Sequence, residues 1–288
     1  MIEVLSPGPF TTVQDLGRPG YAALGVSPSG AADRGSLRLA NRLVGNDEAA
    51  AGLEMTLGGL RARIHALTTV ALTGAPCPAF LDGRAIGMNG PVVVRPGQQL
   101  QVGTPPRALR TYLALGGGLD VPAVLGSRST DVLSGLGPAV LTAGTRLPFG
   151  GQLVAFPNTD LAPTRGYTAT PTLGILPGPR DDWFTTDALA ALCSAAYQVT
   201  KDSNRIGARL HGPVLARATE RELPAEPTVR GALQVPPAGQ PVLFLADYPV
   251  TGGYPVIAVV AERDVDRAAQ LRPGDGVRFR VTRAPGWQ

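Results

Sequence analysis

The chain has 288 residues and a formal net charge of +4, and Lys201 is its only lysine. A P-loop needs a Gly-Lys-Ser/Thr turn and a biotin carrier needs a lysine in a Met-Lys-Met-like turn, so both are excluded. The arginines are scattered along the sequence rather than clustered, so the positive charge does not predict nucleic-acid binding.

The composition predicts a mainly β protein with short helices. The chain has 37 glycines, 28 prolines and only 17% charged residues, a balance typical of many short strands joined by turns. Cys77, Cys193, His65 and His211 are far apart in sequence, which predicts free thiols and no zinc site or other metal site. There is no apolar run of about 18 residues that would span a membrane, and the first residues do not resemble a secretory signal. We therefore expect a soluble, cytoplasmic protein.

The first polar loop follows a strand predicted over residues 2–5. Residues 11–21 bring Gln14, Asp15 and Arg18 together with two glycines and a proline. Gln14 and Arg18 offer planar donors that suit a carboxylate or phosphate. Alternatively, Asp15 and Arg18 pair with each other and brace a surface turn.

A helix is predicted from Asp33 to Gly45. Asp33 is well placed as its N-cap, Gly45 supplies its stop, and apolar residues recur between them at helical spacing. A second short helix is predicted to begin at Asn46, with acidic residues in its first turn.

Strands follow up to residue 115, at 69–73, 92–94, 100–102 and 110–115, and a hairpin turns at Asp82-Gly83. The next polar cluster, residues 121–131, places hydroxyls beside Arg128. Such a cluster suits an anion, although Ser/Thr loops also cap turns. These elements predict an N-terminal β-rich domain over residues 1–160, with one or two short helices.

Residues 156–172 are rich in Pro, Thr, Asn and Gly without periodicity, which predicts a linker between domains. A second domain is predicted over residues 170–288. Its predicted helices lie at 186–195 and 262–270, and its apolar strands include 242–246 and 256–261.

The stretch between these two apolar strands is the main candidate site. Asp247 ends the first strand, and Gly252, Gly253 and Tyr254 precede the second. Adjacent glycines let backbone N–H groups approach a ligand, and a carboxylate and a phenol lie within a few residues of them. The alternative is a β-turn with Tyr254 packed over it.

Ten short motifs in order carry a resemblance to a known family. They are TVQDLGR (12–18), SGAAD (29–33), ANRLVGN (40–46), LEMTL (53–57), ALTGA (71–75), VLGSRST (124–130), LPGP (176–179), SNRIG (203–207), QVPP (234–237) and TGGYP (251–255). On these, the chain resembles the allophanate hydrolase subunit 2 family, also called biotin-dependent carboxyltransferase-like. The best characterised grouping of that family is the C subunit of the bacterial ATP-dependent 5-oxoprolinase.

The resemblance implies two β-barrel-like halves, the C-terminal one cyclophilin-like. It implies a hetero-oligomer with two further proteins of the 5-oxoprolinase, its kinase-inhibitor-family B subunit together with its A subunit. That complex would use ATP with Mg to open 5-oxo-L-proline to L-glutamate, and this chain would carry no biotin. Two alternatives stay open: a carboxyltransferase half-site of a urea carboxylase-like enzyme, and a non-catalytic regulator that binds a histidine-kinase inhibitor.

Residue type and motif position together predict the site residues. Asp247 would be a polar anchor or base and Tyr254 a positioning group. The predicted substrate- or phosphate-binding residues are Gln14, Arg18, Arg128, Asn204, Arg205, Gln234, Thr251, Gly252 and Gly253. The chain departs from the family in one relevant place: Pro249 and Val250 stand where a Gln-Thr pair is common.

Overall fold

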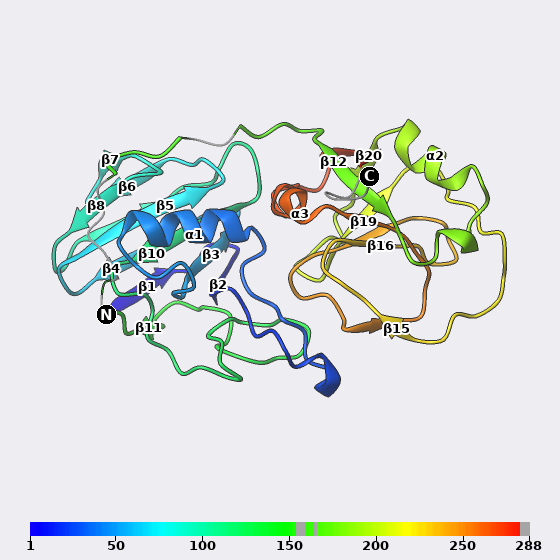
Figure 1. The fold of residues 1–288 in the computed structure, drawn as a ribbon. Coiled ribbons are helices and arrows are strands. Elements are labelled where there is room, and N and C mark those ends of the chain that lie inside the picture. Colours follow the sequence, from blue (N-terminus) through cyan, green and yellow to red (C-terminus); the bar gives the residue numbers. More distant parts are fainter. Residues whose placement is uncertain (152, 154–158, 164–165, 283–288) are drawn as a thin grey trace. The chain divides into compact units, whose positions relative to one another are not determined.

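The chain folds into two compact units (Figure 1). A computed structural model describes residues 1–151, 153, 159–163 and 166–282. The first unit comprises Met1–Arg18, Ser29–Asp131 and Gly135–Gly166, and the second comprises Pro19–Pro28, Val132–Ser134 and Tyr167–Gln288. Two short segments of the N-terminal half therefore belong to the second unit. The predicted linker at 156–172 lies partly outside the described residues, and the predicted domain boundaries stay a prediction.

Two antiparallel sheets build the first unit. The six-stranded sheet has the order β11-β1-β4-β9-β6-β7, and the five-stranded sheet has the order β2-β3-β10-β5-β8. The strands of the first sheet are β1 (Ile2–Ser6), β4 (Arg61–Ile64), β6 (Ala79–Leu81), β7 (Arg84–Ile86), β9 (Gln99–Val102) and β11 (Arg146–Leu147). Those of the second are β2 (Phe10–Gln14), β3 (Gly52–Thr56), β5 (Thr68–Gly74), β8 (Pro91–Val94) and β10 (Arg110–Leu115).

The main core of this unit is formed by the inward faces of both sheets. Side chains such as Ile64 and Leu100 from one sheet and Leu53 and Leu113 from the other join one buried apolar cluster. Alternate residues along a strand point to opposite faces, so the neighbours of these residues face away from that core. What covers each outer face then distinguishes the two sheets.

Helix α1 (Arg34–Leu43) covers the outer face of the five-stranded sheet, where Figure 1 shows it across β5 and β10. Its Ala40 and Leu43 pack against Ala71 and Ala114, so β10 is buried on both faces. The predicted helix and its cap are confirmed, since the Asp33 side chain accepts a hydrogen bond from the Ser36 N–H at 3.0 Å. No helix is described on the outer face of the six-stranded sheet, where Arg61 and Gln101 are exposed.

The second helix expected from Asn46 is wrong. The Asp47 carboxylate accepts the Ala49 N–H at 2.7 Å, and the Ala50 N–H bonds to the Asp47 carbonyl at 3.0 Å. This local bonding closes a turn that leads into β3 at Gly52. The acidic residues that suggested a helix start serve the turn instead.

A closed barrel forms the second unit, with the strand order β12-β19-β16-β17-β14-β13-β20. Its strands are β12 (Thr172–Pro177), β13 (Tyr197–Val199), β14 (Gly207–His211), β16 (Ala232–Gln234), β17 (Val242–Phe244), β19 (Val256–Val260) and β20 (Gly276–Val281). Parallel pairing of β12 with β20 closes it, with Thr172 opposite Arg278. The prediction of a mainly β fold with short helices and a C-terminal barrel is confirmed.

The remaining elements of this unit are short. They are the helices α2 (Ala188–Ser194) and α3 (Glu262–Ala268), the 3-10 turns η1 (Ala22–Leu24) and η2 (Asp181–Trp183), and the ribbon of β15 (Glu226–Pro227) and β18 (Thr251–Gly252). Both helices fall within their predicted ranges. Across the described residues, every helix is too short or too polar to cross a membrane.

Candidate functional site

The loop between β17 and β19, residues 245–255, contains a strand of its own. β18 pairs with β15, with Glu226 opposite Gly252 and Pro227 opposite Thr251. Next to this ladder, the Val250 carbonyl accepts the Thr228 N–H at 3.0 Å, and the Pro249 carbonyl accepts the Thr228 hydroxyl. The 245–255 loop is thus tied along its length to residues 226–228. Pro249 and Val250 contribute backbone carbonyls here, which does not depend on their side chains.

Asp247 is fully buried and its carboxylate is already occupied. Arg205 donates Nε to Oδ2 and Nη2 to Oδ1, each at 2.9 Å, and the Val132 N–H donates to Oδ2 at 3.2 Å. The two backbones are also joined, because the Asp247 N–H bonds to the Arg205 carbonyl at 3.0 Å. A bidentate pair of this kind fixes position as well as charge. Of the two roles predicted for Asp247, this geometry suits the polar anchor better than the base.

Asn204 shapes the turn that presents Arg205. Its side-chain oxygen accepts the Ile206 N–H at 2.8 Å and the Gly207 N–H at 3.3 Å. A side-chain oxygen that binds backbone two residues ahead replaces a backbone turn bond. Asn204 therefore has a structural role within the second unit.

Tyr254 is 45% exposed and sits among groups that fix its position. The Gln234 amide donates to the Tyr254 carbonyl at 3.1 Å, and the Arg217 guanidinium carbon lies 5.9 Å from the centre of the Tyr254 ring. Arg217 is itself anchored by a 2.7 Å bond from Nη2 to the Val235 carbonyl. A guanidinium at this distance from an aromatic face is attracted by the ring. Sequence reasoning missed Arg217, which lies in an irregular segment that no motif marks.

The two glycines of the loop differ in their surroundings. A Cβ on Gly252 would lie 2.4 Å from the Gln234 amide nitrogen, whereas a Cβ on Gly253 would meet nothing nearer than the Leu223 carbonyl at 3.6 Å. Neither glycine has a left-handed backbone, so Gly252 is required for space and not for conformation. Gly252, Gln234 and Tyr254 therefore form one closely packed group.

Gln14 and Arg18 are buried in the first unit, where they hold residues 124–131. Gln14 donates to the Thr130 carbonyl at 2.9 Å, and its own side-chain oxygen is buried without a partner among the described residues. Arg18 donates to the Val124 carbonyl at 3.3 Å and to the Ser129 carbonyl, with Nη1 3.8 Å from the Asp131 carboxylate. Arg18 therefore pairs with Asp131, and the expected Asp15–Arg18 pair is wrong.

Asp15 is the centre of this region. Its carboxylate accepts the Ser127 and Ser129 hydroxyls at 2.6 and 2.5 Å, and the Gly17 and Arg128 N–H groups at 2.7 and 2.6 Å. The Arg128 side chain turns to the Asp120 carboxylate at 3.1 Å and the Val121 carbonyl at 2.8 Å. The hydroxyls of residues 127–129 are thus used to bind a carboxylate of the chain itself.

The predicted site residues fall into two sets, one in each unit. Gln14, Arg18 and Arg128 belong to the first unit; Asn204, Arg205, Gln234, Asp247, Thr251, Gly252, Gly253 and Tyr254 belong to the second. The second set is compact, because Arg205–Asp247 holds the start of the 245–255 loop and Gln234 holds its end. Among the described residues, no three His, Cys, Asp or Glu side chains gather in a way that would hold a metal ion.

Comparison with known proteins extends this description. The family model for the carboxyltransferase domain, subdomains A and B, matches residues 24–281. The chain is 39% identical to the C subunit of 5-oxoprolinase from Escherichia coli over 97% of its own length and 90% of that protein. It is 36% identical to the urea amidolyase of Lachancea kluyveri over 96% of its length, but only 17% of that longer protein.

A solved structure gives the same picture. The crystal structure of TTHA0988 superimposes with a TM-score of 0.89 and 35% sequence identity, covering 97% of this chain and 55% of that one. This chain therefore corresponds to about half of TTHA0988, and to nearly all of the Escherichia coli protein.

Proposed function

Because the chain belongs to the carboxyltransferase domain family, subdomains A and B, we propose that it acts as the C subunit of a 5-oxoprolinase. One observation carries the proposal: the match to the C subunit of the Escherichia coli enzyme spans 97% of this chain and 90% of that protein at 39% identity. The chain thus has the extent of a separate subunit. The matches to urea amidolyase correspond to a small part of a longer protein.

The proposed reaction opens the lactam of 5-oxo-L-proline to L-glutamate. Lactam hydrolysis is slow because the amide is resonance-stabilised and its leaving amine is poor. ATP with Mg would supply the phosphoryl group that activates the lactam carbonyl oxygen. This chain would then contribute donors for developing negative charge and groups that orient the substrate.

Within the chain, the 245–255 loop is our candidate for those groups. We assign the backbone N–H groups of Gly252 and Gly253 to anion binding and the Tyr254 phenol to substrate positioning. The Gln234 bond to the Tyr254 carbonyl and the Arg205–Asp247 pair support these assignments, since they fix both ends of the loop. A group that is held before substrate binds needs no reorganisation during the reaction.

The complex that we propose contains two further proteins, the kinase-inhibitor-family B subunit of the 5-oxoprolinase together with its A subunit. This chain is not expected to be active alone. Gln14, Arg18 and Arg128 would serve the complex indirectly, by holding residues 124–131. We expect the complex in the cytoplasm, where a reducing environment suits the free thiols of Cys77 and Cys193.

A second candidate, carboxyl transfer with a biotin carrier, is favoured by the urea amidolyase match. The two reactions differ in their products. We would combine the purified chain with the A and B subunits, follow L-glutamate release, and separately supply a biotinylated carrier with labelled bicarbonate. Glutamate release that depends on this chain supports the 5-oxoprolinase proposal. Label in a carboxylated product, without glutamate release, would replace it by the carboxyltransferase.

A further inference from the structure

We propose that the outer face of the six-stranded sheet carries a second small-molecule site, which binds a zwitterion of the amino-acid class between Arg61 and Asp82. The site lies wholly in the first unit, and it does not rest on the proposed function.

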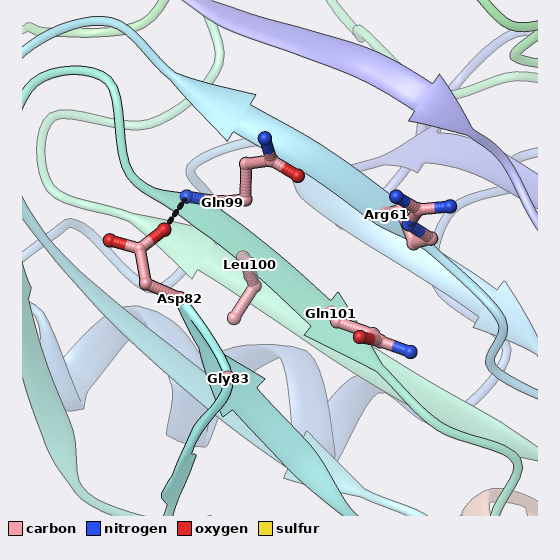
Figure 2. A pocket seen from close by; sticks show the side chains of 6 residues that line it. All are labelled: Arg61, Asp82, Gly83, Gln99, Leu100 and Gln101. Atoms are coloured by element: carbon pink, nitrogen blue, oxygen red, sulfur yellow. Dashed lines mark hydrogen bonds between the residues drawn. The ribbon is translucent and has the colours of Figure 1, made fainter.

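The site is a groove of about 270 Å³ (Figure 2). It is lined by Arg61, Asp82, Gly83, Gln99, Leu100 and Gln101. Strand β9 runs along it, with Arg61 of β4 opposite Gln101 and the Asp82-Gly83 turn beside Gln99. Leu100 is fully buried, so the exposed side chains are polar or charged. Such a lining selects a polar ligand rather than an apolar one.

Arg61 provides a cation whose charge is not neutralised. Its side chain is exposed and makes no hydrogen bond or ion pair within the described part of the chain. The neighbouring Arg146 differs, because it shares Glu3 with His65. An unpaired guanidinium can bind a carboxylate through two parallel bonds, and the Gln101 carboxamide opposite it adds a further donor.

Asp82 provides an anion that is held in place. Its Oδ1 accepts the Gln99 N–H at 2.8 Å, as drawn in Figure 2, and its Oδ2 accepts the Gln98 amide at 2.9 Å. These bonds, first that from the Gln99 backbone, lower the pKa of Asp82. The turn also fixes the backbone, with φ of 47° at Asp82 and 78° at Gly83. A carboxylate has about four acceptor positions, so a ligand ammonium still finds room.

The two charges define the ligand. Gln99 and Gln101 are two residues apart on β9, about 7 Å along the strand. Asp82 lies beside the first and Arg61 beside the second, on opposite sides of β9, and they do not pair with each other. A simple anion would be repelled by Asp82 and a simple cation by Arg61. A molecule with a carboxylate at one end and an ammonium at the other satisfies both.

The test uses three probes that share one carbon chain: 4-aminobutyrate, butyrate and n-butylamine. Each is titrated into the full-length chain, and binding is followed by ligand-observed NMR. We expect 4-aminobutyrate to bind at least tenfold more tightly than either singly charged probe. Equal binding of 4-aminobutyrate and butyrate, or no binding of 4-aminobutyrate, would overturn the proposal.

Variants locate the binding. Arg61→Ala should weaken 4-aminobutyrate binding at least tenfold. Asp82→Asn, which keeps an acceptor for the Gln99 N–H, should abolish the preference over butyrate. Arg63→Ala is the matched control, because Arg63 lies two residues along the same strand and does not line the groove. Melting temperatures establish that each variant is folded. Unchanged binding in Arg61→Ala, or an equal loss in Arg63→Ala, contradicts the assignment.

Discussion

Arg205 and Asp247 form a buried bidentate ion pair, with both N–O distances at 2.9 Å. Removing one partner of such a pair leaves a buried charge unpaired, which costs about 3–5 kcal/mol. We therefore expect Arg205→Ala and Asp247→Ala each to lower the free energy of unfolding by about this amount. The double variant should lose less than the sum, because the second substitution removes the unpaired charge. Denaturant unfolding of all four proteins measures this coupling, and additive losses would show that the pair is not coupled.

The same pair bears on activity. Asp247→Asn keeps an acceptor for the Val132 N–H but removes the charge that Arg205 binds. We expect it to abolish 5-oxoproline-dependent ATP hydrolysis by the assembled complex. Full activity in a folded Asp247→Asn variant would remove Asp247 from the site.

Gly252 and Gly253 offer a matched comparison of two adjacent backbone positions. A methyl group at 252 must displace the Gln234 amide, which holds the Tyr254 carbonyl; at 253 it makes only ordinary contact. A shift of about 1 Å at a reacting group costs about a hundredfold in rate. We expect Gly252→Ala to lose activity on this scale, and Gly253→Ala to stay within a few-fold of the parent. Steady-state assays of both variants at matched complex concentration test this, and an equal effect at both positions would contradict the role given to Gln234.

Asp15 should be among the most sensitive residues of the first unit. Its carboxylate accepts four hydrogen bonds, and each buried donor left without a partner costs about 1–3 kcal/mol. We expect Asp15→Ala to lower the free energy of unfolding by at least about 3 kcal/mol. Asp120→Ala is the control, because its pair with Arg128 is exposed and should contribute less than about 1 kcal/mol. Similar losses in the two variants would show that Asp15 is not the centre described above.

Two buried tyrosines predict a loss of stability in alkali. Burial, followed by the charges of Glu54 and Asp33, raises the pKa of Tyr112 well above its usual value. Burial likewise raises the pKa of Tyr197 to about 12. Above a pH of about 10, a tyrosine in the unfolded chain loses its proton while these two keep theirs, so stability falls as the pH rises. Replacing Tyr197 by Phe should make the decline between pH 10 and 12 less steep; an unchanged slope would contradict the raised pKa.

Local features of the fold could be predicted from the sequence because their causes are local. Asp33 and the apolar spacing after it specify α1, and Asp82-Gly83 specifies a hairpin turn. The helix expected at Asn46 was wrong because Asp47 serves equally well in a turn. The choice between these two depends on β3, which begins only six residues later.

Long-range pairings could not be predicted in this way. The partners of Arg18 lie more than a hundred residues away, so its burial against residues 124–131 leaves no local pattern. The same is true of Arg217 beside Tyr254 and of β12 against β20. For the candidate site, the sequence indicated the 245–255 loop, but not that Gln234 and Arg217 hold its end.

One measurement tests the central proposal most directly. The A and B subunits of the 5-oxoprolinase are assayed for ATP hydrolysis with and without 5-oxo-L-proline, in the presence and absence of this chain, with L-glutamate quantified in the same samples. We predict that 5-oxoproline-dependent hydrolysis and stoichiometric glutamate appear only when this chain is present. Full turnover without it, or a complete complex that releases no glutamate, would contradict the assignment of this chain as the C subunit.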